Sequence, residues 1–432
     1  MHNKKLNILL IILVSILTAV FVFYKFNLIP KNLSFDEVEF AKLALSLDKK
    51  PYIPYSQLAT GHSTLYFYSL LGSLKNFGIN SFALRFPAAF FGILSIFLFY
   101  LIIGKLKNFE LKVKGFNLLP FALSIILLTS RWFINFSRFS FEVTFLLFLE
   151  LTSIYFLLKF EDVKKTKTNT FLILSGIFAG LSFLSYTPGR IFFILPLSFI
   201  ILSFPRRRES NDSGSPIRSR MTLMLCFLIP FIIVITPLTS YLMTHKDTRI
   251  DQQFFLNNHE MPVTEKLTGL WQNISSTALM FNVKGDVNGR HNYPNKPALN
   301  PLLGILFIIG LFISIKNLKN GYNKLFVFYF LLSLLPAIMT YSWENPNMLR
   351  TYTTLPSVVY FIGSAIIFFI NFLNKKIKVK KYRYIIYIII CLVFVLSSFY
   401  ELRTYFKYQS IVFDQAFEIK LPLEKAIKAK NP

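Results

Sequence analysis

Three acidic side chains are gathered near the N-terminus in the segment SFDEVEFAKLAL, residues 34–45. Asp36, Glu37 and Glu39 are three of only 21 acids in a chain with 47 Lys and Arg. Ser34 and Glu37 have the spacing of a capping box, in which each side chain accepts a bond from the other's backbone amide at a helix start. Helix initiation alone would explain all three acids, because acids complement the helix dipole there. The other interpretation leaves Asp36 as a carboxylate that could act as general base toward a hydroxyl.

Arginine, not lysine, supplies the positive charge in three short polar segments that separate apolar runs. The group consists of Arg131 and Arg138 in SRWFINFSRFSFE (130–142), Arg190 in SYTPGR (185–190) and Arg350 in SWENPNMLRTY (342–352). A guanidinium presents a planar fork of donors that binds phosphate through two bonds, so the group favours an anionic ligand. The alternative for any single arginine is snorkelling toward a membrane interface. Glu142 closes the first segment and could support the chemistry or pair with Arg138, four residues earlier.

The elements that must position these residues are membrane helices. Apolar residues make up 54% of the chain and charged residues 16%, against about 25% charged in soluble domains. Recurring apolar runs have the length that a helix needs to cross a hydrocarbon core of about 30 Å. We place eleven of them, at about 7–24, 83–103, 116–133, 141–159, 171–186, 190–204, 221–243, 299–315, 325–341, 351–373 and 384–400. The sequence therefore predicts an all-α polytopic membrane protein.

The basic connections between these spans all fall on one side of the membrane if the eleven spans hold. They are the N-terminal Lys4 and Lys5 and the connections at about 105–114, 164–167, 206–220, 316–324 and 374–383. By the positive-inside rule this side is the cytoplasm, so the N-terminus is cytoplasmic and Asp36 lies on the outer face. We predict a multi-pass protein of a bacterial inner (plasma) membrane. Its net charge of +26 indicates contact with anionic lipid headgroups, not nucleic acid.

The predicted organisation is one transmembrane domain over residues 1–400 with a short outward tail at 401–432. Two long outward loops, 25–82 and 244–298, are rich in aromatic residues and are expected to contain interfacial helices. Long ordered loops on a helical membrane protein usually carry function. Residues 205–220, rich in Ser and Arg, are predicted to form a disordered cytoplasmic insert.

Five segments, taken in order, resemble a known superfamily. They are FDEVEFAKLA after the first span, GHSTLYFYSLLGSLKNFGINSFALRFPAAFFGIL (61–94), SRFSFE, SYTPGR, and GDVNGRHNYPNKPALNPLLGILFIIGL (285–311). The pattern is similar to the GT-C superfamily of polytopic glycosyltransferases. Within it, the chain resembles the branch of protein mannosyltransferases and lipid A aminoarabinose transferases, which use polyprenyl-phosphate sugars. The resemblance runs over roughly residues 5–400.

The resemblance implies roles for individual residues. Asp36 corresponds to the catalytic base, and Glu37 and Glu142 to supporting acids, with Glu37 mainly structural because of its place in the capping box. The positions expected around the donor phosphate are Arg138, Arg190 and Arg350. The residues expected to contact substrate are His62, Tyr66, Asp286, Arg290 and His291.

The implied reaction is inverting transfer of a hexosyl or pentosyl group from a polyprenyl-phosphate donor to a hydroxyl of a lipid, glycan or protein at the outer face. No cofactor follows from the residues, but some relatives use a divalent cation, so Mg²⁺ or Mn²⁺ bridging an acid and the donor phosphate stays open. Two other classes also stay open. A lipid-linked sugar flippase or other transporter should place ionisable residues at mid-membrane, and a glycan polymerase or ligase of another polytopic fold would share the donor type.

Overall fold

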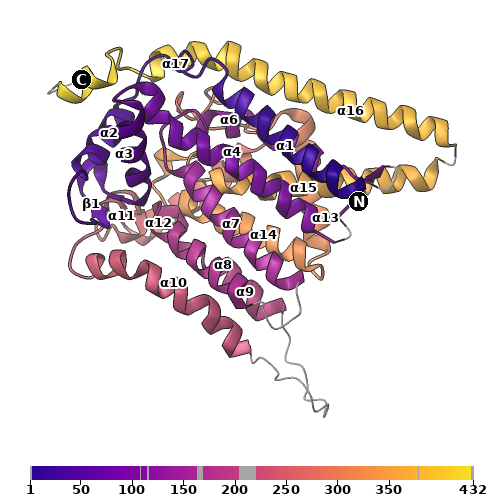
Figure 1. Cartoon of the computed structure of the whole chain (residues 1–432), viewed down its shortest axis with the longest axis horizontal. Helices are drawn as coiled ribbons and strands as arrows, with labels where there is room; N and C mark the ends of the chain where they lie inside the picture. The colour runs from indigo at the N-terminus through magenta and orange to yellow at the C-terminus, as the bar shows by residue number, and fades with distance from the viewer. Residues whose placement is uncertain are drawn as a thin grey trace.

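The computed structural model describes residues 2–107, 109–113, 116–162, 169–203, 220–377 and 379–429. Within these ranges the protein is a bundle of helices (Figure 1), and the only named strands are two short antiparallel pairs of two-residue strands. The pairs are β1 (Tyr55–Ser56) with β2 (His62–Ser63), and β3 (Lys112–Val113) with β4 (Phe116–Asn117). The predicted all-α polytopic class is confirmed. The predicted disordered insert at 205–220 lies outside the described residues, apart from position 220, where a helix begins.

Seven helices of the described chain are long and apolar enough to cross a membrane. They are α1 (His2–Phe23), α4 (Ser81–Lys105), α7 (Val143–Asp162), α10 (Arg220–Leu242), α14 (Gly321–Ile338), α15 (Leu355–Lys376) and α16 (Lys380–Arg403). The most apolar window of α1 is only 17% buried inside the protein, and that of α10 only 22%. Apolar faces of this size are left exposed by helices that face lipid, so the chain is an integral, multi-pass membrane protein.

Four shorter apolar helices coincide with the remaining predicted spans. They are α5 (Leu119–Thr129), α8 (Asn169–Phe183), α9 (Ile194–Ser203) and α13 (Pro301–Lys316). The predicted span 116–133 is interrupted at Ser130, whose backbone is not helical, and α6 (Arg131–Phe136) follows it. The break carries Arg131 and Asn135 into the protein, where both donate to backbone carbonyls that lipid could not offer. The count of eleven spans stays a prediction.

One helix pair shows how closely the bundle packs. At Gly176 on α8, an added Cβ would lie 2.2 Å from the Phe227 carbonyl oxygen on α10, and at Gly180 it would lie 2.8 Å from Val234. Small residues four positions apart let two membrane helices approach backbone to backbone. The sequence spacing Gly-x-x-x-Gly thus explains this contact.

The helices that carry the candidate site lie at one end of the bundle, and the N-terminus lies at the other (Figure 1). This end, called the site end below, contains the segments predicted as the two long outward loops. Its elements are α2 (Phe35–Ser46), η1 (Leu58–Thr60), α3 (Leu65–Phe77), α11 (Thr248–Gln253), η3 (Phe255–Asn257) and α12 (Val263–Met280). The short turns η2 (Thr187–Ile191), η4 (Ser342–Glu344) and η5 (Tyr352–Thr354) complete the connections. The last helix, α16, is followed by η6 (Thr404–Gln409), α17 (Ser410–Ala416) and α18 (Leu423–Lys428).

Candidate active site

The helix α2 begins as the sequence predicts. Ser34 Oγ accepts from the Glu37 amide at 3.2 Å, and Glu37 Oε2 accepts from the Ser34 amide at 3.2 Å. The capping box is therefore confirmed. Val38, Phe40, Ala41 and other apolar side chains of this helix are buried against the protein, so α2 is anchored to the bundle by its apolar face.

Glu37 is fully buried, and its carboxylate is held on several sides. Arg85 on α4 donates to it from Nε at 2.7 Å and from Nη2 at 2.8 Å, and the Ser140 amide donates at 3.3 Å. Arg85 also donates to the carbonyls of Pro30 and Asn32, just before α2. This paired, desolvated carboxylate fixes the start of α2 to α4 and to the segment before α7.

Asp36 differs from its neighbour because its side chain is 41% exposed. Its Oδ2 accepts from Arg290 Nη1 at 2.6 Å. The ion pair joins two segments that are 254 residues apart in the sequence. The carboxylate is therefore oriented by a cation and still open to the outside of the protein.

The loop that carries Arg290 is folded around Asp286. The Asp286 carboxylate accepts from the amides of Asn288 and Met348, each at 2.8 Å, and from His291 Nδ1 at 2.9 Å. Asn135 donates to the carbonyl of Arg290 at 2.8 Å. Asp286 and His291, predicted as substrate contacts, are buried and hold this loop in shape.

A buried row of three side chains lies beside α2. Glu142 Oε1 is 2.5 Å from His62 Nδ1, and Arg249 Nη1 is 2.5 Å from His62 Nε2. This geometry is satisfied with the imidazole proton on Nδ1, which donates to Glu142, while Nε2 accepts from Arg249. Burial lowers the pKa of His62, and Arg249 lowers it further, so the ring is neutral between an acid and a cation. The sequence also allowed an ion pair between Glu142 and Arg138. In the structure Glu142 bonds to His62 instead, and Arg138 donates to backbone carbonyls.

Arg249 also lines a cavity of about 340 Å³ at the site end. Two of the predicted phosphate ligands, Arg190 and Arg350, line the same cavity. Its other walls are mainly apolar, with Ile191 from η2 and Met339 just beyond α14. None of the described residues that line it is acidic. The structure thus brings three guanidinium groups to one apolar space.

Each of these arginines is held in place from behind. Arg190 forms an ion pair with Asp247, while its buried Nε has no hydrogen-bond partner in the described structure. Arg350 donates to Thr340 Oγ1 at 2.9 Å and pairs with Glu344. Arg190 lowers the pKa of Asp247 even though burial opposes this, so the acid is charged.

The cavity is electrostatically linked to Asp36. Burial alone would lower the pKa of Arg249, but Tyr186, Glu142 and Asp36 raise it above its ordinary value. The Arg249 guanidinium carbon also lies 5.3 Å from the centre of the Tyr186 ring. Asp36 is thus one of the groups whose charge favours the charged form of Arg249.

Comparisons with known proteins identify similar sequences and folds. Residues 61–234 match the family model of dolichyl-phosphate-mannose-protein mannosyltransferases. The apo structure of an Archaeoglobus fulgidus oligosaccharyltransferase is similar over 95% of this chain and 56% of its own, with 13% identity and a TM-score of 0.56. The chain has the GT-C fold. The resemblance to the GT-C superfamily expected from the sequence is thereby confirmed.

Further structures extend the comparison. The oligosaccharyltransferase AglB of Archaeoglobus fulgidus, in complex with an inhibitory peptide and a dolichol-phosphate, is similar over 96% of this chain and 56% of its own, with 12% identity and a TM-score of 0.53. ArnT from Cupriavidus metallidurans bound to undecaprenyl phosphate is similar over 98% of this chain and 77% of its own, with 11% identity and a TM-score of 0.48. The chain spans about half the length of the oligosaccharyltransferases. No curated protein sequence matches it.

The remaining predicted residues do not line this cavity. The buried Arg138 guanidinium donates to the carbonyls of Phe21, Val22, Tyr24, Lys25 and Ile29. All five of its N–H groups are used, since Nε also donates to Ile29, so no donor is left for a phosphate. Arg138 thus completes the C-terminal end of α1, where helix carbonyls lack partners. Arg131 is likewise buried and donates to Pro297. Tyr66 is buried on α3, and burial raises its pKa, which keeps the hydroxyl neutral.

The residues present do not form a metal centre of the usual kind. Among the described residues, no three or more His, Cys, Asp or Glu side chains are grouped so that they could hold an ion. Glu142 and His62 are the paired acid and imidazole nearest the cavity, and both are already bonded to each other. The steps of the reaction proposed below are carried by side chains of the protein.

Arg249 and Asp247 were missed by the sequence reasoning. Both lie in the segment HKDTRID (245–251) of a long loop predicted to face outward. The argument that outward arginine marks an anionic ligand applies to Arg249 as well. The criterion of lysine-free short segments did not select Arg249, because its loop is long and contains Lys246.

Proposed function

We propose that this protein is a membrane glycosyltransferase that transfers a hexosyl or pentosyl group from a polyprenyl-phosphate donor to an acceptor hydroxyl. The observation that carries the proposal is the cavity in which Arg190, Arg249 and Arg350 meet apolar walls. A polyprenyl phosphate has the same two parts, an anionic head and an apolar chain. The archaeal AglB, which has the same fold, was captured with a dolichol-phosphate.

The phosphate end of the donor is assigned to the three guanidinium groups. Charge-assisted bonds from arginine to phosphate are short and frequently bidentate. The mainly apolar walls of the cavity strengthen these bonds, and the acids Asp247 and Glu344 orient Arg190 and Arg350 from behind. As the glycosidic bond breaks, charge grows on the phosphate oxygens, and cations fixed in advance stabilise it.

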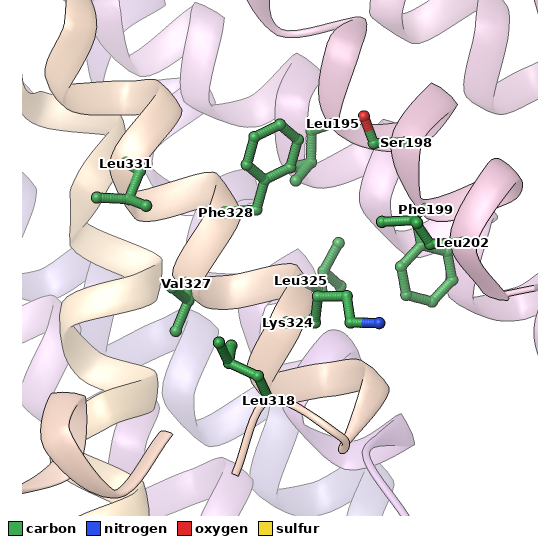
Figure 2. A pocket seen from close by; sticks show the side chains of 10 residues that line it. All are labelled: Leu195, Ser198, Phe199, Leu202, Leu318, Lys324, Leu325, Val327, Phe328 and Leu331. Carbon is green, nitrogen blue, oxygen red and sulfur yellow. The ribbon is translucent and has the colours of Figure 1, made fainter. Parts of the chain in front are cut away.

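The prenyl chain of the donor is assigned to the seam between α9 and α14. Figure 2 shows the far end of this seam, a space of about 280 Å³ where α9 contributes Leu195, Phe199 and Leu202, and α14 contributes Leu325, Phe328 and Leu331. A small gap lined by Phe192, Leu332 and Pro336, among others, adjoins the arginine cavity, with which it shares Pro336. From Lys324 to Met339 the seam follows roughly 22 Å of helix, much of a hydrocarbon core of about 30 Å. Glu150 also lines the gap, and its Oε2 accepts from the Tyr329 hydroxyl at 2.6 Å.

The chemical step is a single displacement. Asp36 accepts the proton of the acceptor hydroxyl, and the hydroxyl oxygen attacks the anomeric carbon of the sugar. The bond from that carbon to the phosphate oxygen breaks, and polyprenyl phosphate leaves with the electron pair, so the sugar configuration is inverted. The exposed side of Asp36 is where the acceptor must approach, and Arg290 holds the carboxylate in orientation.

The buried row of Glu142, His62 and Arg249 is assigned a positioning task. The neutral imidazole accepts from Arg249 and is itself fixed by Glu142, so the guanidinium cannot turn away from the cavity. Glu142 thereby supports donor binding through two hydrogen bonds instead of touching the sugar.

A transfer assay with purified protein in nanodiscs tests the proposal. Labelled polyprenyl-phosphate sugars and a membrane lipid extract are supplied as donor and acceptor, and the product's anomeric configuration is determined. Asp36→Asn is expected to lower transfer about 10²- to 10⁴-fold, the usual cost of losing a general base. Asp48→Asn is the matched control, because Asp48 is a surface acid whose ion-pair partner is Lys75. Near-normal transfer by Asp36→Asn, or movement of donor across the bilayer without transfer, would overturn the proposal.

A further inference from the structure

The chain returns to the site end after its last long helix. α16 runs along the outside of the bundle, and α17 and the C-terminus lie at the same end as α2 and α3 (Figure 1). The segment of residues 410–428, which contains α17 and α18, is called the brace below. It lies close to α2, the helix that carries Asp36.

Three consecutive residues of the brace contact α2 or residues next to its start. The ring of Phe417 lies 5.7 Å from the guanidinium carbon of Arg85, which holds Glu37. Glu418 Oε1 accepts from the amide of Phe35, the first residue of α2, at 3.0 Å. Ile419 exchanges two backbone bonds with Leu33, of 2.9 and 3.0 Å. Together they contact the start of the helix, the arginine that holds it, and Leu33 just before its N-cap.

The same segment contacts the other half of the Asp36–Arg290 pair. An added Cβ at Gly289 would lie 2.8 Å from Val412 Cγ1 and 3.0 Å from Ala416 Cβ, both on α17. Glycine at 289 is therefore needed for the loop next to Arg290 to lie against the brace. Two buried residues of α18, Leu423 and Ala426, complete the contact with α2.

We propose that the brace positions Asp36 for catalysis, and that Glu418 is a positioning residue. Asp36 lies in the first turn of a 12-residue helix, and a helix this short is not stable without outside contacts. Its first amides have no partners inside the helix, so the Glu418 carboxylate supplies one and also complements the helix dipole. Since α17 fixes the Arg290 loop and Glu418 fixes α2, one rigid segment sets the distance between base and cation. The kinetic consequence rests on the proposed transferase function.

The test compares Glu418→Ala, Glu418→Gln and Glu424→Ala in the full-length protein in nanodiscs. Hydrogen–deuterium exchange of the peptide that covers α2 is measured alongside kcat and donor KM. Glu418→Ala is expected to speed exchange at the start of α2 and to lower kcat about 10- to 100-fold with donor KM unchanged, the cost of misplacing a catalytic group. Glu418→Gln keeps the accepting oxygen and should stay near wild type. Glu424→Ala is the matched control, because Glu424 is an exposed acid of the same segment that pairs with Lys428.

The outcomes separate the brace from the function on which it builds. Unchanged exchange at α2, or an unchanged kcat, in Glu418→Ala would overturn the positioning role. An equal loss in Glu424→Ala would also overturn it, because that result would indicate general damage to the segment. If the wild-type protein transfers no sugar, the proposed function fails. In that case, faster hydrogen–deuterium exchange at α2 in Glu418→Ala would still support the structural role of the brace, and unchanged exchange would refute it.

Discussion

Replacing Arg249 by alanine should separate two tasks of this side chain, donor binding and charge balance. In the cavity, one charge-assisted bond to the donor phosphate is lost, which costs about 1.5–3 kcal/mol, or about 10- to 150-fold in kcat/KM. In the buried row, Glu142 and His62, whose Oε1 and Nδ1 atoms are 2.5 Å apart, would lose the neighbouring guanidinium. Removing one member of a buried ion pair costs about 3–5 kcal/mol of folding stability.

A double variant divides these effects. Arg249→Ala combined with Glu142→Gln removes both charges, and the glutamine oxygen can still accept from His62 Nδ1. We expect the double variant to regain most of the lost stability, because no uncompensated charge stays buried. It should not regain donor use, because the cavity still lacks its third guanidinium.

The assay measures thermal unfolding in nanodiscs together with kcat/KM for a polyprenyl-phosphate sugar. Arg403→Ala serves as control, since Arg403 is an exposed arginine that bonds to Tyr408 and does not line the cavity. Recovery of donor use by the double variant would refute a direct contact of Arg249 with the phosphate. Equal stability of the single and double variants would refute the charge coupling across His62.

Three further predictions concern stability. The pKa of His62 is lowered in the fold, so as the pH falls the unfolded chain binds the proton before the folded protein does. The melting temperature should therefore fall as the pH drops below about 6.5, the ordinary pKa of histidine. His62→Gln should weaken this fall in unfolding scans from pH 7.5 to 5. Arg138→Lys should cost more than about 3 kcal/mol, because three donors cannot serve the carbonyls that five now satisfy, and intact thermal stability of this variant would contradict the capping role. Gly176→Ala should reduce the yield of folded protein on size-exclusion chromatography, whereas Gly269→Ala, where an added Cβ meets no atom within 4 Å, should not.

Much of the fold follows from local sequence. Apolar runs of the right length predict the long helices, because lipid allows only structures that satisfy their own backbone. The capping box at Ser34 and Glu37 is predictable because both partners lie within one turn. The break at Ser130 was not predicted, because it depends on carbonyl acceptors offered by a loop about 160 residues further along the chain, such as that of Arg290.

The candidate site could be predicted only in part. The capping-box pattern gives Asp36 and Glu37 different roles in the sequence, and in the fold Glu37 is buried while the side chain of Asp36 is 41% exposed. Its pairing with Arg290 could not be predicted, because it depends on how two loops 254 residues apart are folded against each other. The brace could not be predicted for the same reason, because the sequence around Glu418 indicates only a short tail after the last span.

The arginines show why residue type alone does not assign a role at a membrane boundary. Arg138 and Arg190 both lie in lysine-free segments, and from sequence they are equivalent. In the fold, carbonyls at and just beyond the end of α1 use all the donors of Arg138, whereas Arg190 has an acid behind it and an apolar cavity before it. A guanidinium is a phosphate ligand only if the surrounding backbone leaves donors free, and that condition is set by tertiary contacts. Arg249 meets this condition although its sequence surroundings contain a lysine, so counting the donors left free in the fold is a better guide than the ratio of arginine to lysine.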